Sequence, residues 1–122
     1  MGTLVILLRK IMDCLFCKII NREIPSEIVY EDEKFFVFKD INPIAPVHIL
    51  IIPKKHIHSI NHLEVEDKEL IGELFLTAKK IAKDLKIIES GYRLVFNVGK
   101  EAGQTVDHLH LHLIGGKKLG WQ

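Results

Sequence analysis

The sequence has few cysteines, almost no net charge and no long apolar run. Seventeen Lys and Arg side chains face sixteen Asp and Glu, a formal net charge of +1, which gives no electrostatic reason to expect nucleic acid or an anionic membrane as partner. Two cysteines are too few for a disulfide framework. Hydrophobic residues at 48% exclude a disordered chain, and 122 residues suit one domain with a real core.

The first eleven residues, Met1–Ile11, are apolar before they are basic. A secretory signal has the opposite order and ends at a small-residue cleavage site, and the apolar part is far shorter than the roughly 20 residues of a membrane helix. Two interpretations stay open: an extension from an upstream start, or an extra element that packs on the domain. We expect residues 12–122 to form one domain and the protein to be cytoplasmic.

Hydrophobic periodicity predicts one long helix, a short N-terminal helix or turn, and about five strands. Apolar residues recur at helical spacing over Glu66–Lys86, and the shorter helix or turn is expected over Asp13–Ile20. The β-branched and apolar runs predict these strands: Ile28–Tyr30, Phe35–Lys39, Val47–Ile52, Tyr92–Val98 and His108–Ile114. The sequence therefore predicts a single α+β domain with a mainly antiparallel sheet.

Seven histidines are an unusual number for this length, and three of them, His108, His110 and His112, alternate with leucines. On a strand this puts three imidazoles on one face and three leucines on the other. A surface strand with chance histidines is one interpretation, and a zinc or copper site is another. The outer two residues would lie about 13 Å apart on a strand, so one ion cannot easily bind all three.

Two neighbouring features carry further polar chemistry. The loop Gly99–Val106 contains glycines that let backbone N–H groups approach an anion, and Thr105 adds a hydroxyl. Asn97 lies in an apolar run, and its side-chain amide either contacts a bound anion or is hydrogen-bonded within the protein. Cys14 and Cys17 form a C-x-x-C pair, which is half of a tetrahedral zinc site or a redox pair.

These motifs together resemble the histidine triad (HIT) family of nucleotide hydrolases and transferases, from Cys14 to Gln122. The resemblance covers the His-Leu repeat and these other segments: Phe38–Pro43, Pro46–His48, Ile52–His56, Asn97 and Gly103–Val106. The ending Gly115-Gly116 followed by Trp121 resembles the phosphoramidase-type branch of histidine triad nucleotide-binding proteins. Glu101–Val106 is shared with the dinucleoside polyphosphate branch.

The resemblance implies a catalytic role for each histidine of the repeat. His110 would attack the α-phosphorus of a purine nucleotide and form a nucleotidyl-histidine intermediate, which suits a neutral imidazole. His108 belongs to the same catalytic set, and His112 and His48 would contact the phosphate. The sequence has no apparent cluster of carboxylates for a divalent metal ion, so no catalytic Mg²⁺ is expected.

The remaining implied nucleotide contacts are spread over the chain. Asp40 would accept the ribose hydroxyls, and the loop amides near Gly103 and Gln104 with the Thr105 hydroxyl would hold phosphate oxygens or assist the leaving group, with Asn97 completing that shell. The other implied nucleotide-binding residues are Ile41, Phe16, Ile19, Ile24 and Leu50; on sequence alone, residues such as the last four more often belong to the hydrophobic core.

By the same resemblance, Cys14 and Cys17 would hold a structural zinc with His56 and His108, and His48 is the alternative ligand. The family also implies a homodimer, formed through Glu66–Lys86 and Tyr92–Val98, with Trp121 near the partner's site. A dinucleoside polyphosphate hydrolase and a nucleotide-sensing interaction module with incidental turnover are the alternatives. No nucleic acid or membrane partner is expected.

Overall fold

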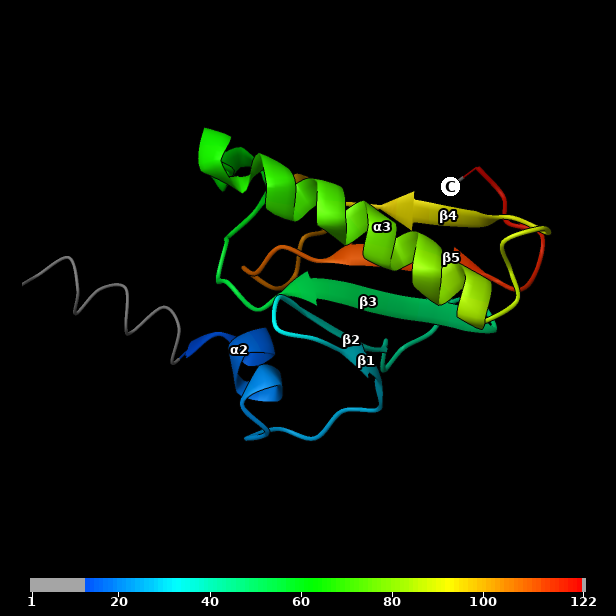
Figure 1. Cartoon of the computed structure of the whole chain (residues 1–122), viewed down its shortest axis with the longest axis horizontal. Coiled ribbons are helices and arrows are strands. Elements are labelled where there is room, and N and C mark those ends of the chain that lie inside the picture. Colours follow the sequence, from blue (N-terminus) through cyan, green and yellow to red (C-terminus); the bar gives the residue numbers. More distant parts are fainter. Residues whose placement is uncertain (1–12, 122) are drawn as a thin grey trace, which may run out of the picture.

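The computed structural model describes residues 13–121, so the expectations for Met1–Ile11 lie outside the described residues. An antiparallel sheet of five strands has the order β1-β2-β3-β5-β4, and two α-helices lie against it (Figure 1). The elements are α2 (Leu15–Ile20), β1 (Ile28–Glu31), β2 (Phe35–Lys39), β3 (Val47–Pro53), α3 (Lys68–Asp84), β4 (Tyr92–Val95) and β5 (Leu111–Gly115), with three short 3-10 helices at Ile60–His62, Val65–Asp67 and Lys100–Ala102. The predicted α+β architecture is confirmed.

Alternation along the strands divides the buried side chains between two faces of the sheet. On one face, α3 covers the centre of the sheet (Figure 1), and its Leu74, Ala78 and Ile81 pack against Phe35, Ile51 and other inward residues of the strands. The leucines of the histidine–leucine repeat that lie in β5, Leu111 and Leu113, point to this face and are fully buried. The leucine side of the repeat is therefore part of the hydrophobic core.

The opposite face carries a smaller core under α2. Phe16 and Ile19 of α2 pack with Phe36, Phe38 and Leu50 of the strands. His112 is the register partner of Leu50, and it alternates with the two buried leucines, so the imidazoles lie on the α2 face. The short helix thus covers the side of the sheet on which the histidines are found.

The strand predicted over His108–Ile114 is shorter, because β5 begins at Leu111. Continued pairing would require the Pro53 carbonyl, but the His108 ring donates to that oxygen at 2.8 Å. The Leu109 N–H donates instead to the Ile57 carbonyl at 2.6 Å. The strand predicted over Tyr92–Val98 also ends early, at Val95, opposite His112, since the segment before Leu111 has turned toward Ile57.

The predicted helix Glu66–Lys86 is α3, Lys68–Asp84, preceded by the 3-10 turn Val65–Asp67. Asp67 fixes this start, because its carboxylate accepts from the Glu64 N–H at 2.9 Å and from Lys55 Nζ at 2.6 Å. At the other end Lys86 has φ +62°, and the Ile87 N–H donates back to the Ala82 carbonyl at 3.0 Å. This is a Schellman ending with lysine at the position that favours glycine. Among residues 13–121, no helix is both long enough and apolar enough to span a bilayer.

Candidate active site

His110 lies at the entrance to β5, and main-chain geometry fixes which of its ring nitrogens carries the proton. Its Nδ1 is 2.7 Å from the carbonyl oxygen of His108. A carbonyl only accepts hydrogen bonds, so Nδ1 is the donor and, in the neutral ring, Nε2 keeps its lone pair. A neutral imidazole with an unprotonated Nε2 is the form that can attack an electrophile.

Burial favours the neutral form of this ring. His110 is 7% exposed, and this burial lowers its pKa below the ordinary value of 6.5, although the bond to the His108 carbonyl and the charge of Asp40 oppose the shift. Phe16 packs edge-on against the ring, with 5.1 Å between the ring centroids. Helix α2 therefore supplies an apolar wall for the candidate nucleophile.

His112 belongs to a second group of side chains, with His48 and Asp40. His48 Nε2 lies 2.9 Å from His112 Nδ1 and 3.3 Å from Asp40 Oδ2. Burial first, and then the neighbouring charges of His110 and His48, lower the pKa of His112 to about 4. The three groups lie beside His110, whose ring centroid is 5.1 Å from that of His112.

The loop after β2 shapes the same region. Asp40 Oδ1 accepts from the Asn42 N–H at 2.8 Å, which leaves a turn that exposes Ile41 to 91%. The Ile44 N–H donates to His48 Nδ1 at 3.2 Å. Asp40 is therefore a turn residue that also lies beside the histidines, and its contact with a ribose stays a prediction.

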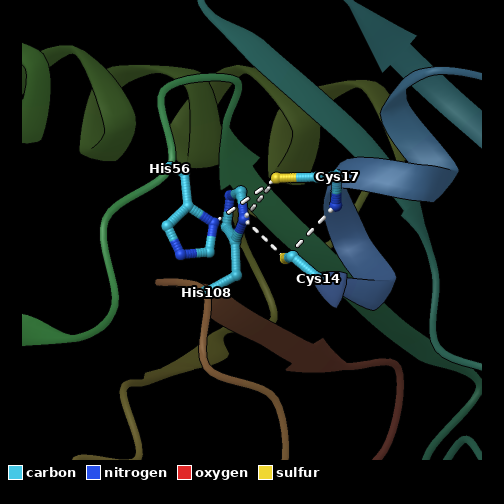
Figure 2. A group of neighbouring side chains, drawn as sticks. All are labelled: Cys14, Cys17, His56 and His108. Atoms are coloured by element: carbon cyan, nitrogen blue, oxygen red, sulfur yellow. Dashed lines mark hydrogen bonds between the residues drawn. The ribbon is translucent and has the colours of Figure 1, made fainter. Parts of the chain in front are cut away.

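The triad does not form one cluster, because His108 turns to the two cysteines. Figure 2 shows Cys14, the N-cap residue of α2, and Cys17 within α2 facing His56 and His108, which come from two separate loops. The Sγ of Cys14 is 3.3 Å from His108 Nδ1, and the Sγ of Cys17 is 3.4 Å from His56 Nδ1 and 3.6 Å from His108 Nδ1. One ligand atom from each residue lies within 4.8 Å of all the others.

These residues fit a four-coordinate metal ion. Two sulfurs and two imidazole nitrogens are a standard structural zinc set, and its bond lengths put sulfur and nitrogen about 3.6 Å apart at a tetrahedral angle. The separations above match that value. His108 Nε2 donates to the Pro53 carbonyl at 2.8 Å, so Nδ1 has its lone pair directed at the sulfurs, as a metal ligand requires.

The thiol of Cys17 is unsuited to redox chemistry. Burial, followed by the neighbouring Cys14, raises the pKa of Cys17 to about 12, whereas a reactive redox thiol has a lowered pKa. The alternative that His48 is a ligand beside the cysteines is wrong, because His48 lies with Asp40 and His112.

The glycine-bearing loop is held by its own side chains. Gln104 Oε1 accepts from the Gly99 N–H at 2.9 Å, and Gln104 Nε2 donates to the His58 and Val106 carbonyls at 2.7 and 3.1 Å. Asn97 Nδ2 donates to the Ala102 carbonyl at 2.9 Å. Both amides therefore have structural partners and shape the loop.

The tip of this loop is open. Gly103 has φ +86° and no atom within 4 Å of where a Cβ would stand, and Thr105 is exposed. This accessible backbone is the part of the predicted phosphate cradle that a ligand can reach.

The residues considered for a base pocket, Phe16, Ile19 and Leu50, are at most 7% exposed and belong to the α2 core; Ile24 packs at its margin. They form one apolar surface behind the histidines. Their role toward a nucleobase stays a prediction.

Sequence reasoning missed the main-chain atoms that organise the site. The Pro53 and His108 carbonyls and the Ile44 N–H each fix the proton position of one histidine. Backbone groups carry no side-chain signal, so only the spatial approach of the loops reveals them.

Comparison with known proteins shows the family to which the chain belongs. The family model of the HIT domain matches residues 21–119, and the chain belongs to this family. A HIT-like protein of Synechocystis is 53% identical over 109 residues, which is 89% of this chain and 95% of the relative, and one of Synechococcus elongatus is 51% identical over the same shares.

Solved structures give the same result. A HIT family hydrolase from Legionella pneumophila superposes with a TM-score of 0.88 at 51% identity, covering 89% of this chain and 97% of its own. A histidine triad nucleotide-binding protein from Candida albicans superposes with a TM-score of 0.77 at 38% identity, covering 90% and 83%.

Proposed function

We propose that the protein hydrolyses nucleoside phosphoramidates or phosphoanhydrides at the α-phosphorus, through a covalent intermediate on His110. The observation that carries this proposal is the 2.7 Å bond from His110 Nδ1 to the His108 carbonyl, because it leaves a neutral Nε2 lone pair. The names of similar structures, a HIT family hydrolase and a histidine triad nucleotide-binding protein, agree with it.

The reaction has two displacements at phosphorus. In the first, the Nε2 lone pair of His110 forms a bond to phosphorus while the bond to the leaving nitrogen or oxygen breaks, and the leaving group keeps that electron pair and takes a proton from solvent. In the second, a water oxygen bonds to phosphorus and gives one proton to solvent. The bond between phosphorus and Nε2 breaks with its electron pair returning to the ring, which restores the neutral imidazole and gives a nucleoside monophosphate. Positioning and charge stabilisation supply most of the catalysis in such transfers.

Other residues take the supporting roles. His112 accepts at Nδ1 from His48 Nε2 at 2.9 Å, so its neutral ring carries its proton on Nε2, from which it can donate to a phosphate oxygen or the leaving group. Asp40 would accept the ribose hydroxyls with Ile41 beside it. The open amides near Gly103 and the Thr105 hydroxyl would hold phosphate oxygens.

The substrate class we favour is a purine nucleoside phosphoramidate, as in the phosphoramidase-type branch. Dinucleoside polyphosphates are the alternative, and nucleotide sensing with incidental turnover is the other. The test compares kcat/KM for an adenosine phosphoramidate and a diadenosine polyphosphate, and rapid quenching should trap one nucleotidyl group on His110. Turnover without any trapped adduct at single-turnover times contradicts the covalent route.

We propose further that Cys14, Cys17, His56 and His108 hold a structural zinc ion. The support is the match of the sulfur–nitrogen separations to a tetrahedral set and the orientation of His108 by the Pro53 carbonyl. A closed four-ligand zinc site contributes binding free energy to folding. The ion would tie α2, and with it Phe16, to the loops that carry the nucleophile.

A homodimer is the proposed assembly. The strand β4 lies at the edge of the sheet, and α3 exposes Phe75 to 42% and Leu76 to 67%. Phe75 packs edge-on against Phe96, next to that strand, at 6.1 Å between ring centroids. An unpaired edge beside apolar helix residues is suited to pairing with a second copy, and Trp121, 96% exposed, would lie near the partner's site. Sedimentation giving a monomer of 14.0 kDa at micromolar concentration contradicts this.

A further inference from the structure

Two groups of side chains in residues 13–121 have the composition of a metal site. One is the cysteine–histidine group described above, and the other consists of Asp40, His48 and His112, whose ligand atoms also lie within 4.8 Å of one another. One carboxylate with two imidazoles is a set that binds several divalent transition metals. Composition alone therefore predicts a second metal ion directly beside the nucleophile.

The hydrogen bonds of His48 place its proton on the atom that such an ion would need. The Ile44 N–H donates to Nδ1 at 3.2 Å, so Nδ1 keeps its lone pair. Asp40 Oδ2 lies 3.3 Å from Nε2, and a carboxylate only accepts, so Nε2 carries the proton. Two independent contacts thus give the same tautomer, with an N–H directed into the group.

His108 has the same tautomer but the opposite orientation. Its Nε2 proton goes to the Pro53 carbonyl at 2.8 Å, and its lone pair on Nδ1 faces the cysteines. A carbonyl behind the ring supports metal binding in front of it, as in most histidine–metal sites. Behind His48 the backbone offers a donor in place of an acceptor.

We propose that the main-chain N–H of Ile44 keeps transition-metal ions off the Asp40–His48–His112 group. A metal ion on His48 Nε2 would displace the proton to Nδ1, where it would face the Ile44 N–H. His48 is 7% exposed, so the proton moved to its Nδ1 would not find a water molecule readily and would be left against another donor. The ion would lose one of three ligands, and an unfavourable contact behind a ligand weakens metal binding by about 10- to 100-fold.

The two groups therefore differ in metal binding because the backbone group behind one histidine is an acceptor and the one behind the other is a donor. The Pro53 carbonyl favours metal binding at the cysteine–histidine group, and the Ile44 amide disfavours it at the Asp40–His48–His112 group. Asp40 and His112 then stay available to bind a nucleotide. This last step rests on the proposed function, whereas the prediction about metal binding does not.

The test titrates the full-length, metal-stripped protein with Co²⁺ and, by calorimetry, with Ni²⁺, without nucleotide. We expect about one tightly bound ion per chain with the sulfur-to-cobalt absorption of a thiolate site, lost in the Cys14→Ser, Cys17→Ser variant. A second ion of similar affinity that Asp40→Asn removes would overturn the proposal. Because no turnover is measured, failure here is separate from failure of the hydrolase.

The decisive variant replaces Ile44 with the α-hydroxy acid that has the same side chain, so that an ester oxygen stands where the N–H was. We expect this protein to gain a second Ni²⁺ site at least about tenfold tighter than the unmodified chain, and Asp40→Asn to abolish it. The same ester at Ala45 is the matched control and should bind no additional ion. Equal second-site affinity in the two esters would contradict the role of this amide.

Nitrogen-15 NMR of the unmodified protein provides a check that needs no variant. The His48 signals should show an unprotonated Nδ1 and a protonated Nε2 in the metal-loaded and metal-free protein alike. The reverse tautomer would overturn the inference.

Discussion

The main-chain carbonyl of His108 accepts a hydrogen bond from Nδ1 of His110 at 2.7 Å, while the imidazole of His108 lies 3.3 Å from the sulfur of Cys14. One residue therefore contacts the candidate nucleophile through its backbone and the candidate zinc group through its side chain. Movement of the metal group would be transmitted to the nucleophile across a single residue.

Replacing the nucleophile should abolish turnover and spare binding. We expect His110→Ala to lose activity below detection while nucleotide affinity stays within about tenfold, since a nucleophile acts chiefly in the transition state. Calorimetric titration with a nucleoside monophosphate gives the affinity, and single-turnover kinetics give the rate. Near-normal activity in this variant would contradict the covalent mechanism.

The pH profile should show a nucleophile that stays neutral in mild acid. Burial lowers the pKa of His110 below 6.5, and the protonated ring is inactive, so kcat/KM should be retained as the pH falls through 6.5 and decline only below it. Measurement of kcat/KM from pH 8 down reports the free enzyme. An acid limb centred at or above 6.5 would show that the ring is not desolvated as the structure indicates.

Removing zinc should affect stability more than chemistry. Elemental analysis of protein purified without chelator should give about one zinc per chain, and the Cys14→Ser, Cys17→Ser variant should unfold at a lower temperature while retaining most of its kcat in the cold. The reason is that the four zinc-binding side chains would hold α2 against the loops, and none of them is proposed to contact the phosphate during the reaction. Complete loss of activity in a folded variant would assign the metal to catalysis, and absence of metal with unchanged stability would leave a simple buried thiol pair.

The Schellman ending of α3 offers a stability test far from the histidines. Lys86 has φ +62°, which glycine adopts without the steric cost of a Cβ. Lys86→Gly should therefore raise the free energy of unfolding by about 0.5–1 kcal/mol. The matched control, Lys83→Gly inside α3, should lower it by about 1 kcal/mol. Equal and opposite outcomes from the two positions, measured by denaturant unfolding, would confirm that the backbone angle is responsible; a loss at both would refute it.

Periodicity in the sequence determined most of the architecture. The β-branched run at Val47–Ile52, the helical spacing of Leu74, Ala78 and Ile81, and the alternation of histidine with leucine all predict elements that the structure contains. These predictions succeed because the side-chain period of each element is a local property of the chain. The C-x-x-C pair and the resemblance also indicated Cys14, Cys17, His56 and His108 as one metal group, and the structure brings these four together.

The tertiary structure alone decided which partners and which proton position each histidine of the repeat has. The repeat predicts three equivalent imidazoles, yet His108 joins the cysteines, His110 packs against Phe16, and His112 joins His48. The difference comes from the Pro53 carbonyl, which ends the strand pairing by bonding the His108 ring, and from the Ile44 amide, which fixes the proton of His48. Both are backbone groups of loops distant in sequence from the repeat, so their effect on proton positions exists only once the loops have been brought beside the sheet.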